Sequence, residues 1–293
     1  MKQYENMDLK LETHYWDKPS AKSAFKKFIL DIHGLDFSAW DKAGFWDKAH
    51  TPFSFFKNGQ IISSISIYLL DAIISGRSTR LVQISGVGTS SEWRKLGLSR
   101  ELTNIGLEWA KEKHEGIFLF ADEDAIPYYE KTGFNALDEY IQIIRVVPQP
   151  SNGRIIKLDP AKASDLDEIY RYARQRAPLS DIFSIMNAKL LMFHVLYFLK
   201  DHIYAIPDLN ILISFKHEQG MLKIFDIIGA QIPKFEDIYP YISSPESDVI
   251  EFHFHTDKLD ISAVETKRLS GNHLFVRSGF PLQEPVFPYT SRA

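Results

Sequence analysis

The chain has 293 residues and no cysteine, which excludes disulfides, a thiolate nucleophile and cysteine-based metal sites. Hydrophobic residues make up 45% of it and the formal net charge is −4, so we expect folded cores rather than disorder and no nucleic acid or anionic membrane as partner. Residues 1–17 hold no apolar signal segment and the longest apolar runs are too short to span a bilayer, so we expect a cytoplasmic protein, and the length suggests two domains.

The first third of the chain predicts a strand, a helix and a hairpin. Residues 7–14 are expected to form the strand, and Pro19 to begin a helix that closes at Gly34. An Asn-Gly pair at 58–59 separates the apolar runs 53–56 and 61–70, which is typical of two strands joined by a tight turn.

An aromatic connection, residues 36–52, lies between that helix and the hairpin. It holds Trp40, Phe45 and Trp46, which either pack the first helices onto the sheet or cover an acceptor pocket, and both roles can hold together. Its polar side chains could meet an amine, although each of them is more often solvated; they are Asp36, Asp41, Asp47 and His50.

The central stretch, residues 81–134, carries the chemistry. A β-branched strand is followed by the hexapeptide Arg94-Lys95-Leu96-Gly97-Leu98-Ser99, and an amphipathic pattern then predicts a helix. A helix N-terminus presents free N–H groups and a partial positive charge, and both suit a phosphate. A second strand, residues 117–121, and a short helix, residues 125–131, complete the stretch.

This order of motifs resembles the coenzyme A-binding core of the GNAT acyltransferase superfamily. The family motif R/Q-x-x-G-x-G/A is matched by Arg94, Gly97 and Ser99. A second family motif, N-x-x-A-x-x-x-Y-E-K-x-G-F, is matched from Ala125 and from Tyr129 to residue 134, with Asp122 in place of the usual asparagine.

The resemblance implies where coenzyme A binds. The family's fourth and fifth strands splay apart and the pantetheine lies in the gap. The implied cofactor contacts are Val87, Gly88, Thr89, Arg94, Lys95, Leu96, Gly97, Leu98, Ser99, Asp122 and Tyr129. Tyr129 matches the tyrosine that protonates the leaving thiolate in many members, with packing against Tyr128 as the alternative, and no metal is expected.

The general base stays open at this stage. The strand that often carries a carboxylate in relatives offers Gln83 and Ser85 here. A water relay is one alternative, and the carboxylate of Ala293 is another, since some multidomain relatives place their last residue in the active site. Carboxylate candidates near the motifs in sequence are Glu92, Asp122, Glu123 and Asp124.

The second half reads as a degenerate copy of the first. A Pro-rich linker, residues 148–153, separates the two, so we expect domains at 1–147 and 153–293, with residues 135–147 as the last strand of the first. A strand, two helices, a hairpin and a further strand recur in order, and residues 274–280 echo residues 128–134. The expected fold class is α/β (α+β): two GNAT-like domains, each a mixed, mostly antiparallel twisted sheet flanked by helices.

The copies differ where a phosphate would bind. A shift of 143 residues places Asp237 at Arg94 and Pro240 at Gly97, so an acid replaces the cation and proline removes an N–H. The second copy is therefore expected to pack against the first and help close the acceptor site. His253 and His255 face one side of a strand, but a third metal ligand is not evident beyond Asp257.

The resemblance implies an N-acetyltransferase that moves an acetyl group directly from acetyl-CoA to the amine of a small molecule or peptide. A non-catalytic acyl-CoA-binding or regulatory protein is the alternative, and it would not need Tyr129. A purely structural module would bind no ligand at all.

Overall fold

The first half of the chain forms the expected strand, helix, hairpin and phosphate-loop elements. The computed structural model describes residue 4, residues 7–271 and residues 273–293. In order, the elements of this half are β1 (Lys10–Thr13), α1 (Pro19–His33), α2 (Ser38–Lys42), β2 (His50–Lys57), β3 (Gln60–Ile74), β4 (Arg77–Thr89), α3 (Leu98–Ala110), β5 (Gly116–Phe120), α4 (Ile126–Glu130), β6 (Asn135–Ala136) and β7 (Tyr140–Arg145).

Turn and cap residues explain where these elements begin and end. Pro19 is the first residue of α1, and Gly34 closes it in the left-handed region at φ 68°, with its N–H donating to the Leu30 carbonyl. Asn58 and Gly59 both have positive φ, 51° and 77°, as a tight hairpin turn between β2 and β3 requires.

The second half repeats part of this order. Its hairpin matches the expectation, whereas the helix after it was not predicted, and Pro240 lies inside that helix rather than before it as Gly97 lies before α3. The elements are β8 (Ile156–Lys157), α5 (Ala163–Gln175), β9 (Phe183–Ile185), α6 (Ala188–Tyr197), β10 (Ile203–Ile206), β11 (Ile211–Glu218), β12 (Met221–Ile228), α7 (Phe235–Ile242), β13 (Val249–Phe252), β14 (Glu265–Arg268) and β15 (Leu274–Val276).

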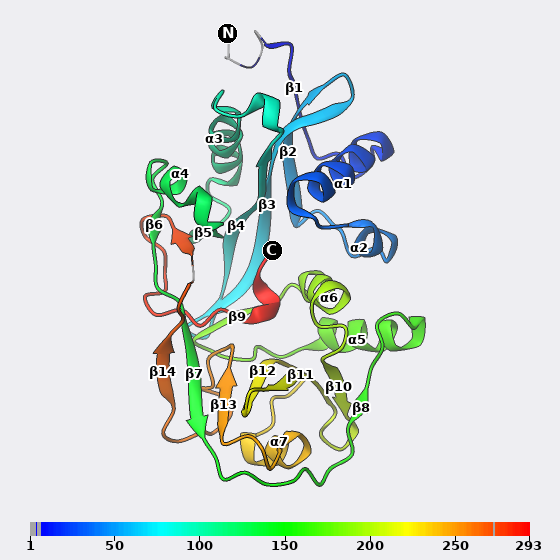
Figure 1. Ribbon diagram of the computed structural model, residues 1–293, viewed down its shortest axis with the longest axis vertical. Helices are drawn as coiled ribbons and strands as arrows, with labels where there is room; N and C mark the ends of the chain where they lie inside the picture. Colours follow the sequence, from blue (N-terminus) through cyan, green and yellow to red (C-terminus); the bar gives the residue numbers. More distant parts are fainter. Residues whose placement is uncertain (1–3, 5–6, 272) are drawn as a thin grey trace.

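Two mixed sheets, one above the other in Figure 1, organise the molecule. The first has the order β1-β2-β3-β4-β5-β15-β6, with β9 paired to β3, and the second the order β14-β7-β13-β12-β11-β10-β8. Neighbouring strands run antiparallel except for β4 with β5 and β12 with β13, which are parallel. The fold class is as expected, and the parallel pair recurs at the same place in each half.

The sheets exchange strands, which the sequence division did not anticipate. β7, within the segment expected to end the first domain, lies in the second sheet between β14 and β13. β15 lies in the first sheet between β5 and β6. The proposed domains, 1–147 and 153–293, therefore do not coincide with the two sheets.

The expected echo of residues 128–134 in residues 274–280 is also wrong. Tyr128 and Tyr129 lie in helix α4, whereas Leu274 and Phe275 are buried in strand β15. The gap between β5 and β6 needs a strand, and the apolar Leu274–Val276 segment fills it by pairing with both. Local similarity of the two segments is thus overridden by the sheet that they join.

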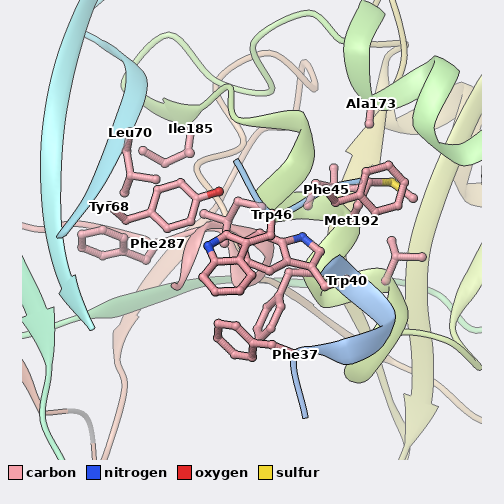
Figure 2. Close-up of a cluster of buried hydrophobic side chains, with 14 of the residues drawn as sticks. Phe37, Trp40, Phe45, Trp46, Tyr68, Leu70, Ala173, Ile185, Met192 and Phe287 are labelled. Atoms are coloured by element: carbon pink, nitrogen blue, oxygen red, sulfur yellow. The ribbon is translucent and has the colours of Figure 1, made fainter. Parts of the chain in front are cut away.

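Buried side chains join the two halves into one body. A large cluster spans the aromatic connection, β3 and the second-half helices, as Figure 2 shows for Trp40, Tyr68 and Met192. Separate clusters lie under α3 and within the second sheet. Within the described residues, no helix combines the length and apolar character needed to cross a membrane.

Candidate active site

A split between two parallel strands opens the site. β4 and β5 pair at three positions, the last being Gln83 with Phe118. β4 then continues to Thr89 with β3 on one side, while β5 ends at Phe120 and pairs on its other edge with β15. Beyond Gln83, the edge of β4 that faces β5 has no strand partner, so its backbone groups can pair with an extended ligand.

A β-bulge in β4 marks the same place. Ser66 pairs with Ser85 and Ser64 with Gly88, so two residues of β4 stand opposite one residue of β3. Gly86 has φ 56°, and a Cβ there would lie 3.3 Å from Ile29 Cδ1. A glycine is therefore required at the bulge by both backbone angle and the close approach of α1.

The predicted pantetheine contacts lie just past this bulge. The last residues of β4 are Val87, Gly88 and Thr89, and they lie beyond Gln83, where β4 no longer pairs with β5. A Cβ on Gly88 would lie 2.9 Å from Ile32 Cγ2, so α1 packs directly on this glycine. The structure thus brings these three residues to the split, and their ligand contacts stay a prediction.

The phosphate loop follows β4 immediately. Lys95 and Gly97 both have positive φ, 65° and 79°, and Gly97 stands directly before α3. No side chain caps the first turn of α3, so its N–H groups remain available to an anion. Arg94, Lys95 and Leu96 are exposed beside it, as a loop that binds pyrophosphate from solvent requires.

A chain of hydroxyl groups holds the loop against the sheet. Thr89 Oγ1 lies 2.8 Å from Ser63 Oγ and 2.7 Å from Ser99 Oγ, which ties β3, β4 and the start of α3 together. Arg94 Nε donates to the Thr89 carbonyl at 3.2 Å. Ser99 therefore has a structural role that is independent of any ligand, while Leu98 is buried under the helix.

Tyr129 is a buried tyrosine whose hydroxyl has no hydrogen-bond partner among the described residues. It is 5% exposed on α4, and its ring centroid lies 5.1 Å from that of Tyr128 and 6.0 Å from that of Phe275. Burial raises the pKa of Tyr129, and the Tyr128 and Asp122 side chains add to the rise. The phenol therefore stays protonated at neutral pH, as a proton donor must.

The Asp122 carboxylate interacts electrostatically with one side chain on each side of the split. Its exposed carboxylate raises the pKa of Tyr129, and it opposes the lowering of the His33 pKa that burial causes. His33 is the last residue of α1, whereas Tyr129 lies on α4. Both helices therefore end near one carboxylate.

A pocket opens beside the bulge. Its cavity has a volume of about 110 Å³ and is lined from α1, the aromatic connection, the hairpin strands, β4 and α6. Ser85 and Gly86 lie at its β4 side, and Leu190 and Phe193 come from the second half. The second half thus helps to close this pocket.

The aromatic connection both lines the pocket and packs against the second half. Trp40 lines the pocket, whereas Phe45 packs on Tyr170 at 4.8 Å between ring centroids. His50 also lines the pocket, and its Nδ1 accepts a hydrogen bond of 2.9 Å from Trp46 Nε1. Burial lowers the pKa of His50 to about 3, so its imidazole is neutral at physiological pH.

Two buried hydroxyl groups on β3 have no partner. Ser66 Oγ and Tyr68 Oη both line the pocket, both residues are at most 1% exposed, and neither atom has a hydrogen-bond partner in the described structure. The sequence analysis did not single these two out. The sequence feature that could have identified them is their spacing: Ser66 and Tyr68 are two residues apart in an apolar strand, so both lie on one face.

Comparison with known proteins decides the family. Residues 12–134 match the family model described as Acetyltransferase (GNAT) family, a span that contains the split, the loop and Tyr129. The first half of this chain is a GNAT acetyltransferase domain. This match supports acyltransferase activity of the first half in general terms.

Solved structures share the fold over nearly the whole chain. A probable N-acyltransferase of Enterococcus faecalis matches with a TM-score of 0.56 at 14% identity, covering 92% of this chain and 72% of that one. A GCN5-related N-acetyltransferase of Kribbella flavida has a TM-score of 0.53 at 13% identity, covering 92% and 71%. Eis1 of Mycobacterium abscessus has a TM-score of 0.53 at 15% identity, covering 96% and 81%. A search of curated proteins found no match.

The last residues of the chain run from the second half into the GNAT site. Ala293 lines the pocket, its N–H donates to Gln83 Oε1, and its carbonyl accepts from Gln83 Nε2, both at 2.8 Å. Three residues earlier in the chain, Thr290 Oγ1 donates to Asp226 Oδ2 at 2.5 Å. Gln83 on β4 and Asp226 on β12 are 143 residues apart, the shift that relates the two copies, so equivalent positions hold both ends of this segment.

The candidates for the general base fall into two groups, one exposed and one at the pocket. Glu92, Asp122, Glu123 and Asp124 are exposed and none of them lines the pocket, while Gln83 is occupied with Ala293. Ser85 and the Ala293 main chain do lie at the pocket.

The histidines considered for a metal have other partners. His253 Nε2 lies 2.7 Å from Glu251 Oε1, and His255 Nε2 accepts from the Val286 N–H at 3.2 Å. Across residues 4, 7–271 and 273–293, no cluster of three or more potential ligands is arranged to hold a metal ion.

Acid should weaken the fold through His194, which holds the final segment. Its Nε2 lies 2.6 Å from the Arg292 carbonyl, and burial lowers its pKa to about 4. Between pH 6.5 and 4 the unfolded state binds the extra proton, so stability falls as the pH falls through that window. In His194→Gln, which keeps a donor, we expect the loss of unfolding free energy between pH 7 and pH 5 to shrink by about 1–2 kcal/mol.

Chemical denaturation at the two pH values measures this effect. His14→Gln serves as the control: His14 is exposed, and although burial and Lys113 lower its pKa in the same direction, its replacement should reduce the pH dependence less than His194→Gln does. An identical pH dependence in His194→Gln and the parent protein would mean that His194 is already protonated in the folded state.

Proposed function

We propose that this protein is an N-acetyltransferase that transfers an acetyl group from acetyl-CoA directly to an amine acceptor. The observation that carries the proposal is the split between β4 and β5, with a helix N-terminus that no described side chain caps at one end and a pocket beside it. An extended pantetheine would pair with the free edge of β4, and the pyrophosphate would lie on the N–H groups of residues 95–99.

The proposed reaction needs the two substrates in contact and two proton movements. The amine nitrogen attacks the thioester carbonyl carbon, a C–N bond forms, and the C–S bond breaks. The nitrogen loses one proton to a group at the pocket, and the leaving thiolate takes one proton from Tyr129. Ser85 and Gly86, where the strands part, lie between the pocket and the free edge of β4.

Titration calorimetry with acetyl-CoA tests the coenzyme site. We expect one site per chain, and we expect Arg94→Glu to weaken binding at least about tenfold, because a charge-assisted contact becomes a repulsion. Lys111→Glu is the matched control: the same charge reversal at the opposite end of α3 should leave the affinity within about twofold.

Three results would change the proposal. No binding by the parent protein would leave a GNAT fold without a coenzyme site. Two sites per chain would mean that the second half also binds coenzyme A, against the acid and proline found there. Equal effects of the two variants would mean that net charge rather than the Arg94 loop governs binding.

A further inference from the structure

The pocket beside the bulge has one apolar end. Phe37, Trp40, Leu190 and Phe193 form it, and Figure 2 shows Phe37 and Trp40 close together within the aromatic cluster. The rings of Phe37, Trp40 and Phe193 lie 5.5 Å apart, centroid to centroid, so they form a continuous wall. At about 110 Å³, the cavity suits one ring or a short branched hydrocarbon rather than a long chain.

The other end carries hydroxyl groups that are still unpaired. Ser66 Oγ and Tyr68 Oη are buried without partners, and Ser66 pairs across the strands with Ser85 at the bulge. Buried polar atoms are nearly always hydrogen-bonded, so these two indicate a ligand atom that completes them. They lie on the side where the reacting amine would meet the thioester.

Acidic side chains are turned away from this pocket. No Asp or Glu side chain of the described residues lines it. In the aromatic connection, Asp41 pairs with Lys22 and Lys26, Asp47 lies 3.4 Å from Lys189, and Asp36 is exposed with Oδ1 on the Ser38 N–H. A second ammonium group against the ring wall would therefore have no Asp or Glu side chain of the described residues to pair with, which is unfavourable.

We propose that the acceptor is a small primary monoamine whose carbon skeleton is a single aromatic ring or a short branched chain. The inference rests on the proposed acetyl transfer and names its substrate class. The hydrocarbon part occupies the wall of Phe37, Trp40 and Phe193, and the amine faces Ser66 and Tyr68. Polyamines are disfavoured because their second ammonium group would meet the ring wall, and aminoglycosides and peptide amines are larger than the cavity.

An acceptor panel tests this class directly. With saturating acetyl-CoA, thiol release is followed for 2-phenylethylamine and 3-methylbutylamine against butane-1,4-diamine, spermidine, kanamycin and a lysine-containing peptide. We expect kcat/KM for the two monoamines to exceed that for every other amine at least about tenfold.

A matched pair of variants tests the pocket itself. Phe193→Leu removes ring volume from the lining, and Phe45→Leu removes the same volume from the aromatic cluster outside it. The ratio of kcat/KM for 2-(1-naphthyl)ethylamine to that for 2-phenylethylamine should rise about tenfold in Phe193→Leu and stay within about twofold in Phe45→Leu.

The outcomes separate this inference from the proposed function. If acetyl-CoA binds and a polyamine, aminoglycoside or peptide is the best acceptor, the monoamine inference is wrong while acetyl transfer stands. If acetyl-CoA fails to bind and none of the amines is acetylated, the proposed function itself fails. Should Phe193→Leu not fold, the panel with the parent protein still decides.

Discussion

Replacing Tyr129 with phenylalanine should lower kcat for acetyl transfer about 10²- to 10³-fold while acetyl-CoA still binds, because general acid catalysis contributes factors of this size. The Tyr129 side chain is 5% exposed, its hydroxyl has no hydrogen-bond partner among the described residues, and burial raises its pKa so that it keeps its proton. The ring would remain packed on Tyr128 and Phe275, so the fold should be preserved.

Tyr128→Phe is the matched control for this experiment. Tyr128 precedes Tyr129 on the same helix, and its hydroxyl lies 3.5 Å from Thr103 Oγ1, so its loss should change kcat by less than about threefold. Stopped assays give kcat and calorimetry gives the affinity for acetyl-CoA. Full activity in Tyr129→Phe would remove this residue from the mechanism, and an inactive parent protein that binds acetyl-CoA would favour the regulatory alternative.

Breaking the buried ion pair of the second half should cost about 3–5 kcal/mol of unfolding free energy. Arg176 and Asp226 are 5% and 0% exposed and form two hydrogen bonds of 3.0 and 2.7 Å. In Arg176→Met, the Asp226 carboxylate would keep the Thr290 hydroxyl as its one side-chain donor among the described residues, and it would remain buried with its charge. Equilibrium urea denaturation measures the loss.

Two further variants test whether the unpaired buried charge of Asp226 causes the loss of stability. Arg80→Met removes a pair with Asp71 whose side chains are 52% and 65% exposed, and should cost less than about 1 kcal/mol. The double variant Arg176→Met/Asp226→Leu should recover much of the loss, because no buried charge is left unpaired. A double variant as unstable as Arg176→Met would mean that the lost hydrogen bonds and packing, not the orphaned charge, cause the instability.

This ion pair also explains what the second half contributes. Asp226 stands where Gln83 stands in the first half, and both positions hold the final segment of the chain. Gln83 pairs with the Ala293 main chain and Asp226 with the Thr290 hydroxyl, so both positions anchor the end of the chain. The degenerate half therefore supplies pocket walls and an anchored segment to the GNAT half.

Several features could be predicted because their signals are local. The Asn-Gly turn, the ends of α1 and the loop before α3 each depend on glycine or proline backbone preferences that operate over a few residues. The alternation of apolar residues predicted the strands, and two motifs in order predicted the site stretch, residues 81–134. The placement of Tyr129 on a short helix follows from the same stretch.

The pocket could not be predicted, because its walls come from distant parts of the chain. Trp40 and Phe193 are 153 residues apart in sequence, and Gln83 meets Ala293 across 210 residues. The two-residue period of a strand shows that Ser66 and Tyr68 lie on the same face of β3. Which groups cover that face depends on how the two halves of the chain pack together.

By itself, the sequence determined the resemblance to the GNAT family, the fold class, the loop before α3 and the short helix that carries Tyr129, since each depends on short-range backbone geometry or on a motif. Only the tertiary structure decided that Tyr129 is buried, that β7 and β15 exchange sheets and that the second half lines the pocket beside the bulge. Residues 274–280 show why: their sequence echoes a helix, but pairing on both edges and burial of Leu274 and Phe275 make them a strand. Strand pairing and burial are contacts between distant segments, and they outweigh local preference wherever the two disagree.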